Sequence, residues 1–124
     1  MPNVRVGEIW TFLVPLTNDN TKYKARPVLI VSVNEDFVHY ESINYVVISS
    51  TSVEEKFDVV IRDEVASRIG LQSKSIIKTT NIYTENKTSL GQKIGELPKG
   101  ILNQFKKKYQ AFQEYIINQL NYKC

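Results

Sequence analysis

The sequence predicts a mainly β fold with a C-terminal helix, in which a small antiparallel sheet curls into a barrel. Five or six short apolar segments separated by polar turns precede residue 97 of the 124 residues, a pattern typical of small antiparallel sheets. Beyond that point apolar residues recur every three or four positions, as in an amphipathic helix. With no repeat or linker in the sequence, we expect one domain over 1–124, with the barrel over about 5–97 and the helix over about 98–121.

The expected strands are rich in β-branched and aromatic residues and are bounded by turn formers. The polar stretch LTNDNTKYKA at residues 16–25 lacks an apolar period and predicts an exposed loop. Trp10 lies inside the first strand, so we expect it in the core, with base stacking as the alternative. The predicted strands are GEIWTFLVP at 7–15, RPVLIVSV at 26–33, NYVVISS at 44–50, FDVVIR at 57–62 and one or two within KSIIKTTNIY at 74–83.

The predicted C-terminal helix has one apolar stripe, with Pro98 at a plausible first-turn position. We expect this stripe to pack on the barrel or to serve as an interface, and a nucleic-acid role for the helix is the alternative. The stripe comprises Ile101, Leu102, Phe105, Tyr109, Phe112, Ile116, Ile117 and Leu120.

The absence of membrane-spanning and secretory patterns in the sequence indicates the expected cellular location. No apolar run approaches the roughly 18 residues that span a bilayer, so we expect no membrane association. The first ten residues have no secretory signal pattern, and the only cysteine is Cys124 at the end of the chain, which we expect to be an exposed thiol. We therefore expect a cytoplasmic protein.

Several classes of chemistry are excluded by residue counts. One histidine, His39, and one cysteine cannot form a zinc site, a Cys/His nucleophile pair or a two-histidine ribonuclease site. The chain has no GxGxxG, GxxxxGK[ST] or GxSxG motif, which removes the usual dinucleotide, P-loop and hydrolase signatures. We expect neither a metal nor a cofactor.

Arg26 is the leading candidate for the remaining chemistry. Arginine can neutralise the transition state of phosphodiester cleavage and donate two hydrogen bonds to its oxygens. The chain has twelve lysines but only four arginines, and Arg26 stands where a polar stretch meets a buried strand begun by Pro27. The alternative is a structural arginine that caps the strand or pairs with an acid. Eight of the thirteen acids lie within residues 32–65, which leaves the rest of the chain basic and suited to a polyanion.

The order of these motifs resembles one known family. GEIW at 7–10, ARPVLIVS at 25–32, VVISS at 46–50, SIIKTTNI at 75–82 and KIGEL at 93–97 follow one another as in the MazF/PemK toxins of toxin–antitoxin pairs. The resemblance covers about residues 5–120. It implies an SH3-like small barrel of the MazF/PemK/CcdB type, packed by short helices and a long C-terminal helix.

The resemblance also implies an activity. Members are homodimeric mRNA interferases, inhibited by a cognate antitoxin, that cleave single-stranded RNA without a metal. The 2′-hydroxyl attacks the adjacent phosphate, leaving a 2′,3′-cyclic phosphate and a 5′-hydroxyl. By position, Arg26 matches the arginine that stabilises the transition state and protonates the leaving oxygen. Either Ser49 or Ser50 matches the hydroxyl that orients the phosphate, with Thr51 as its neighbour.

Further site residues follow from the polar stretch and the late lysines. Members often have a glycine-rich loop with a glutamate before the arginine. Here the stretch has no glycine, and Asp19, its only acid, is the candidate counterpart. We expect RNA binding through phosphate attraction by lysines, base stacking on an aromatic ring and a hydroxyl contact. The expected RNA-binding residues are Lys22, Tyr23, Lys24, Thr51, Lys74 and Lys78.

Two function classes therefore remain open. The first is an active endoribonuclease with an antitoxin partner, favoured by Arg26, Ser49 and Ser50. The second is a PemK-like module that binds nucleic acid or protein without cleavage, favoured by the altered stretch at 16–25.

Overall fold

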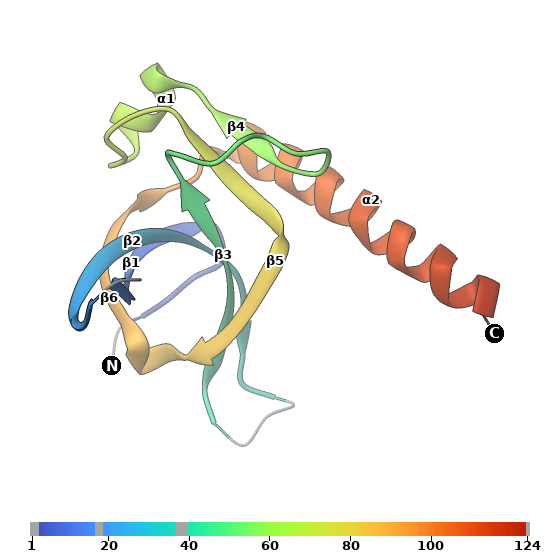
Figure 1. The fold of residues 1–124 in the computed structure, drawn as a ribbon, viewed down its shortest axis with the longest axis horizontal. Coiled ribbons are helices and arrows are strands. Elements are labelled where there is room, and N and C mark those ends of the chain that lie inside the picture. The colour runs from blue at the N-terminus through green and yellow to red at the C-terminus, as the bar shows by residue number, and fades with distance from the viewer. Residues whose placement is uncertain (1–2, 17–18, 37–39, 124) are drawn as a thin grey trace.

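The computed structural model describes residues 3–16, 19–36 and 40–123, so His39 and Cys124 lie outside the described residues. Its elements are β1 (Glu8–Leu16), β2 (Asp19–Asn34), β3 (Ser42–Ser49), β4 (Val59–Ile61), α1 (Asp63–Arg68), β5 (Ser75–Asn86), the 3-10 turn η1 (Lys87–Ser89), β6 (Leu90–Glu96) and α2 (Lys99–Lys123). All strand pairs are antiparallel. The strand order is β4-β5-β3-β2-β1-β6 (Figure 1). This confirms the predicted antiparallel sheet with a C-terminal helix.

The sheet curls but does not close into a complete barrel, because its edge strands β4 and β6 are not paired with each other (Figure 1). Backbone packing joins the end of α1 to β6 instead. A Cβ atom on Gly70 would collide with the carbonyl oxygen of Ile94, and one on Gly95 with the carbonyl oxygen of Ile69. Position 70 requires glycine for a second reason as well: its φ of 91° falls in the left-handed region, which residues with a Cβ atom rarely adopt.

Residues 19–25 of the polar stretch form part of a strand, so the prediction of a loop there was wrong. β2 begins at Asp19 and pairs with β1, with Lys24 opposite Val14 and Ala25 opposite Leu13. Cross-strand hydrogen bonds join backbone groups and need no apolar side chains, so a polar composition did not exclude a strand here. Residues 17 and 18 lie outside the described part of the chain.

The late strands also differ in part from the prediction. The segment expected to hold one or two strands is the single strand β5, which continues to Asn86. The sixth strand is β6, whose only aliphatic side chains are Leu90 and Ile94. A strand with so few apolar residues lacks the alternation of apolar and polar positions from which strands are predicted.

Apolar residues cover both faces of the sheet, because neighbouring residues in a strand point to opposite sides. One cluster, which includes Ile9 and Leu29, packs towards α1 and α2. The other includes Trp10 and Val28 and packs with Val4. Trp10 is 6% exposed, and its indole N–H donates to Glu8 Oε1 at 3.1 Å, which confirms the core prediction.

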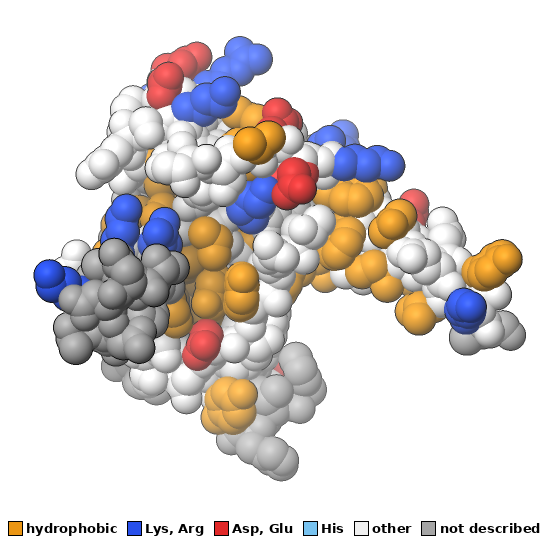
Figure 2. Space-filling model, viewed as in Figure 1, with side chains coloured by type: hydrophobic (Ala, Val, Ile, Leu, Met, Phe, Trp, Pro, Cys, Tyr) orange, Lys and Arg blue, Asp and Glu red, His pale blue; other side chains and the backbone are white. Residues whose placement is uncertain are grey.

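Helix α2 packs on β4 and β5 through its first half. Phe105 is buried there, and Phe57 contacts Phe112 with ring centroids 5.5 Å apart. The second half projects beyond the sheet with apolar side chains along it (Figures 1 and 2). Ile117 and Leu120 there are 49% and 58% exposed, so the stripe packs on the sheet only in part. In the part of the chain that the structure describes, no helix is both long and apolar enough to span a membrane.

Candidate active site

Arg26 lies in the body of β2, opposite Phe12 of β1. It is exposed, whereas Pro27 beside it is half-buried, and the proline ring fixes φ directly after the arginine. Among the side chains that the structure describes, no carboxylate pairs with the Arg26 guanidinium. The described side chains therefore do not support the alternative that Arg26 is a structural arginine paired with an acid.

A pocket of about 340 Å³ brings Arg26 together with residues from five parts of the chain. Its floor is apolar and includes Pro27, Ile48 and Ile94. Its polar lining offers two cations and several hydroxyls, and no carboxylate or imidazole belongs to the described lining. The polar lining consists of Thr11, Lys24, Arg26, Ser50, Gln72, Ser73 and Ser75.

The two candidate serines have different surroundings. Ser49 Oγ accepts hydrogen bonds from the backbone N–H groups of Thr51 and Ser52, at 3.3 and 3.1 Å, and from the Ser52 hydroxyl at 2.7 Å. Ser49 thus holds the turn after β3. Ser50 lines the pocket, and its hydroxyl has no hydrogen-bond partner among the described residues. The structure therefore places Ser50 beside Arg26 and gives Ser49 a structural contact.

Lys78 was expected to bind RNA, but it does not line the pocket. Its ammonium group lies 2.6 Å from Asp58 Oδ2 and 3.0 Å from Glu55 Oε1 and also donates to the carbonyl oxygen of Val53 at 3.3 Å. The hydrogen bond to Asp58 raises the pKa of Lys78 more than burial lowers it. The structure thus shows Lys78 holding the loop that follows Ser50.

Of the other predicted residues whose side chains are described, Lys24 lines the pocket and Lys22, Thr51 and Lys74 do not. Lys74 is exposed between two lining serines, and its backbone N–H donates to Asp63 Oδ1 at 2.6 Å. Lys22 is an exposed residue of β2, and Thr51 follows Ser50 in the turn. The side chains of Asp19 and Tyr23 lie outside the description.

Thr11, Gln72 and the glycine turn at 70–71 belong to the pocket but were not predicted. Ser73 and Ser75 accompany them, and Ser75 Oγ donates to the carbonyl oxygen of Ser73 at 2.9 Å. Thr11 Oγ1 accepts from the backbone of Gln92 at 2.8 Å. Alternation along β1 could have placed Thr11 on the same face as Ile9, but no local pattern brings residues 11 and 72 together.

Cation ligands are not grouped anywhere in the described part of the chain. Across residues 3–16, 19–36 and 40–123, no three His, Cys, Asp or Glu side chains are grouped so as to hold a metal ion. The arrangement can bind an anion through Lys24 and Arg26 and orient it through the serine hydroxyls.

The comparisons with known proteins agree with this fold. The model of the PemK-like, MazF-like toxin family of type II toxin–antitoxin systems matches residues 5–112. Since this is most of the chain, the protein belongs to that family. No curated protein matches the chain.

Solved structures with the same fold come from several bacteria. A mycobacterial endoribonuclease in complex with its cognate antitoxin is 21% identical, with a TM-score of 0.64 over 88% of this chain and 93% of that one. The toxin MazF-mt6 of Mycobacterium tuberculosis is 23% identical, with a TM-score of 0.60 over 84% and 96%. A chain of a MazE–MazF crystal structure from Deinococcus radiodurans is 13% identical, with a TM-score of 0.59 over 87% and 92%.

Proposed function

We propose that this toxin-family protein is an endoribonuclease that cleaves single-stranded mRNA at a short motif without a metal ion. The observation that carries the proposal is the pocket that joins Arg26 and Lys24 with Ser50, Ser73 and Ser75. Two cations and several hydroxyls suit a phosphodiester anion better than a neutral amide or sugar. The names of the similar mycobacterial structures support the same class of reaction.

In the proposed reaction the 2′-hydroxyl oxygen of RNA attacks the adjacent phosphorus, and the bond from phosphorus to the 5′-oxygen breaks. The 2′-hydroxyl proton passes to water and the leaving 5′-oxygen takes a proton from water, which yields a 2′,3′-cyclic phosphate and a 5′-hydroxyl. Because RNA carries this nucleophile itself, the protein mainly has to align it and stabilise the charge that develops.

Arg26 stabilises the negative charge on the phosphate oxygens by donating hydrogen bonds from its guanidinium group. In this proposal Arg26 acts through its charge and its hydrogen bonds, and proton transfer is left to water. Ser50 orients the phosphate through its unengaged hydroxyl. Lys24 and Lys74 attract the RNA backbone without reading its sequence.

The partners and location follow from the same proposal. An antitoxin accompanies the mycobacterial and Deinococcus proteins in two of the similar structures, which supports an antitoxin as partner and inhibitor of this chain. We also propose a homodimer, supported by the apolar residues that α2 exposes beyond the sheet. The cytoplasm is the compartment where the protein meets mRNA.

A second candidate function is a nucleic-acid-binding or protein-binding module without cleavage. One observation favours it: the described residues that line the pocket include no carboxylate or imidazole, and these are the usual general bases. Binding of an anion needs only the cations and hydroxyls that are present.

The test compares the wild-type chain with Arg26→Ala on a long, weakly structured RNA in EDTA. Primer extension maps the cut ends, and the need for kinase treatment before ligation identifies 5′-hydroxyls. Arg62→Ala is the matched control, because Arg62 is exposed and lies outside the pocket. We expect cuts at a short recurring motif, reduced about 10²–10³-fold in Arg26→Ala and unchanged in Arg62→Ala.

The outcomes separate the two candidates. RNA binding without cleavage by the wild-type chain would establish the binding module and reject the enzyme. Cleavage that survives Arg26→Ala would reject the pocket as the active site. Cleavage that needs added Mg²⁺ would reject the metal-independent reaction.

A further inference from the structure

The loop at 50–58, green in Figure 1, joins β3 to β4 and begins at the candidate active site. Residues 50–56 are all exposed, so the packing of buried side chains does not fix this part of the loop. Ser50, at its beginning, lines the Arg26 pocket. The contacts that hold the 50–58 loop therefore also decide where the Ser50 hydroxyl lies.

One side chain, Lys78 of β5, holds the loop at three points. Its ammonium group donates to the carbonyl oxygen of Val53 at 3.3 Å, to Glu55 Oε1 at 3.0 Å and to Asp58 Oδ2 at 2.6 Å. An ammonium group has three N–H donors, so these three contacts engage all of them. None is left for an RNA phosphate unless a contact to the loop breaks.

The contact with Asp58 is itself anchored in the sheet. Asp58 is buried, and its carboxylate also accepts from the backbone N–H groups of Glu55 at 3.0 Å and Thr79 at 3.3 Å. Thr79 follows Lys78 in β5, which is paired with both β3 and β4. A strand with neighbours on both sides is a firm support for the loop. We call Lys78, Glu55 and Asp58 the Lys78 clamp.

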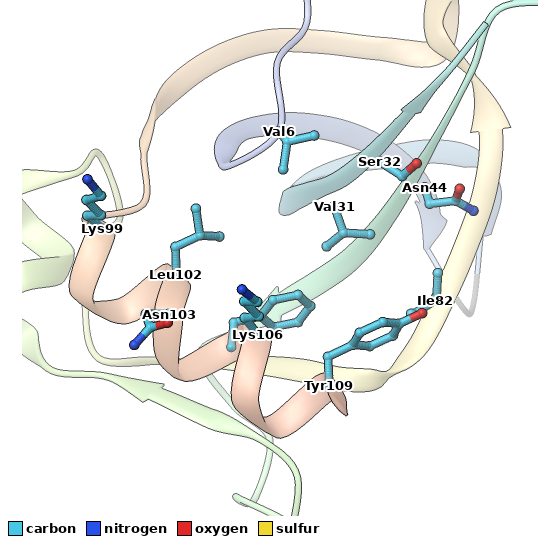
Figure 3. A pocket seen from close by; sticks show the side chains of 11 residues that line it. Val6, Val31, Ser32, Asn44, Ile82, Lys99, Leu102, Asn103, Lys106 and Tyr109 are labelled. Carbon is cyan, nitrogen blue, oxygen red and sulfur yellow. The ribbon is translucent and has the colours of Figure 1, made fainter. Parts of the chain in front are cut away.

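Helix α2 supports the other end of the loop. Lys108 Nζ donates to the carbonyl oxygen of Lys56 at 3.2 Å, close to the end of the loop that lies away from Ser50. The first half of α2 borders a second groove, a cavity of about 630 Å³ across which Leu102 and Tyr109 face Val31 of β2 (Figure 3). None of the described residues that line this groove belongs to the 50–58 loop or to the Arg26 pocket.

The position of Ser50 depends on the backbone of the loop. Ser49 Oγ is tied to the turn by three hydrogen bonds, whereas the Ser50 hydroxyl has no hydrogen-bond partner among the described residues. The Ser50 side chain thus moves with the loop. A group that aligns a reacting phosphate must be placed accurately, because a displacement of about 1 Å can cost up to about 100-fold in rate.

We propose that Lys78 is a positioning residue, an inference that rests on the proposed function: through the Lys78 clamp it keeps the Ser50 hydroxyl beside Arg26, where the phosphate of the RNA is oriented. Lys78 does not line the pocket, and its three donors are engaged by the loop. It therefore acts on the reaction through Ser50 and not by binding RNA, the role expected for it from the sequence.

The test is a double-mutant cycle of Lys78→Met and Ser50→Ala. Single-turnover cleavage of the RNA is measured over a range of protein concentrations, which separates the rate at saturation from the half-saturating concentration. Lys78→Arg is the conservative variant, because it keeps a cation with N–H donors. The control is Lys87→Met, which removes a lysine that is paired with Glu41 and lies outside the clamp and the pocket.

Circular dichroism checks that each variant folds. Should Lys78→Met not fold, Glu55→Ala takes its place in the cycle, because the Glu55 side chain is 75% exposed and its removal leaves no buried charge unpaired.

Lys78→Met should lower the rate at saturation by about tenfold and leave the half-saturating concentration within about twofold of the wild type. In the Ser50→Ala background the same change should cost less than about twofold, because the hydroxyl that it misplaces is absent. Lys78→Arg should recover most of the rate, and Lys87→Met should match the wild type. Glu55→Ala should give a smaller loss, about threefold, that also disappears in the Ser50→Ala background.

Hydrogen exchange followed by mass spectrometry reports on the loop without any RNA. Lys78→Met should speed the exchange of peptides that cover residues 50–58 by about tenfold or more, because the loop opens more often when the clamp is lost. Ser50→Ala and Lys87→Met should leave these peptides unchanged.

Three results would overturn the proposal. A full loss of rate that persists in the Ser50→Ala background would show that Lys78 does not act through Ser50. Weaker RNA binding with a smaller salt dependence, at an unchanged saturated rate, would assign Lys78 to RNA binding. Unchanged exchange at 50–58 would show that the clamp does not hold the loop.

Failure of the proposed function gives a different result. A wild-type chain that does not cleave RNA would overturn that function and with it any role of Lys78 in the reaction, while the exchange data would still decide whether Lys78 holds the loop. Cleavage by the wild type with independent effects of Lys78 and Ser50 would overturn the positioning role alone.

Discussion

The Lys78 ammonium lies 2.6 Å from Asp58 Oδ2, and this contact ties β5 to the end of the loop that begins beside the candidate active site. Asp58 is 2% exposed and also accepts from the backbone N–H groups of Glu55 and Thr79 at 3.0 and 3.3 Å. Since Lys78 holds Val53 and Glu55 as well, one lysine fixes much of the segment between Ser50 and β4.

Replacing Lys78 should lower the free energy of unfolding. Lys78→Met leaves the buried Asp58 carboxylate without its cation, and breaking a buried pair in this way costs about 3 kcal/mol of unfolding free energy. Urea denaturation measures the change. The control is Lys87→Met, because its partner Glu41 has a side chain that is 45% exposed and stays solvated, so about 1 kcal/mol or less should be lost. Equal losses in both variants would contradict the argument.

Stability should fall at acidic pH partly through Glu8. Burial raises the pKa of Glu8, but hydrogen bonds from Lys93, the Arg5 backbone and Trp10 outweigh burial and lower it below the ordinary 4.5. A lowered pKa means that the stabilisation is fully present above the unfolded value and is lost as the pH falls through the folded value.

Thermal melts of the wild type between pH 6 and pH 2 test this (about two units either side of the ordinary carboxyl pKa). Glu8→Gln should be less stable near pH 6 and should lose less stability on acidification. A Glu8→Gln chain with the same pH dependence as the wild type would show that other carboxyl groups account for the acid loss.

Ser49 and Ser50 should respond differently to alanine. Ser50→Ala removes a hydroxyl that lines the pocket without a described hydrogen-bond partner, so RNA cleavage should fall by about tenfold or more with little change in melting temperature. Ser49→Ala removes three hydrogen bonds that hold the turn, so stability should fall by about 1 kcal/mol. Cleavage rates and thermal melts are measured on both variants. A loss of cleavage only in Ser49→Ala and a loss of stability only in Ser50→Ala would contradict these roles.

Gly95→Ala should be strongly destabilising, because its Cβ would collide with the backbone of Ile69 and backbone atoms cannot move aside as side chains do. We expect a loss of about 3 kcal/mol or more in urea denaturation. Gly100→Ala is the matched control: apart from its chain neighbours and the helix's own backbone, no atom lies within 4 Å of its Cβ position in α2. Alanine there should stabilise the helix by up to about 1 kcal/mol. A tolerated Gly95→Ala would mean that α1 does not pack on β6 as described.

Strand and helix periodicity made much of the fold predictable. Trp10 and Leu29 lie in short apolar runs rich in aromatic and β-branched residues, and the helix was expected over about 98–121 and observed over Lys99–Lys123. The strand conformation of polar residues 19–25 and of β6 was not predicted. These segments contain few apolar residues, and their pairing is decided by the backbone of neighbouring strands rather than by their own composition. Leu120 belongs to the regular apolar stripe of α2. It is exposed because the helix extends beyond the edge of the sheet, which the sequence pattern does not reveal.

The sequence alone determined the family, the position of Arg26 directly before Pro27 in a strand and the residue types available for chemistry, because each of these is a local pattern. Only the tertiary structure decided that Ser50 lines the pocket while Ser49 holds a turn, that Lys78 binds Asp58, and that α2 borders a second groove. The physical reason is that the pocket and the pair of Lys78 with Asp58 bring together residues distant in sequence, such as Thr11 and Gln72 in the pocket lining. Their meeting depends on strand register and on the curl of the sheet.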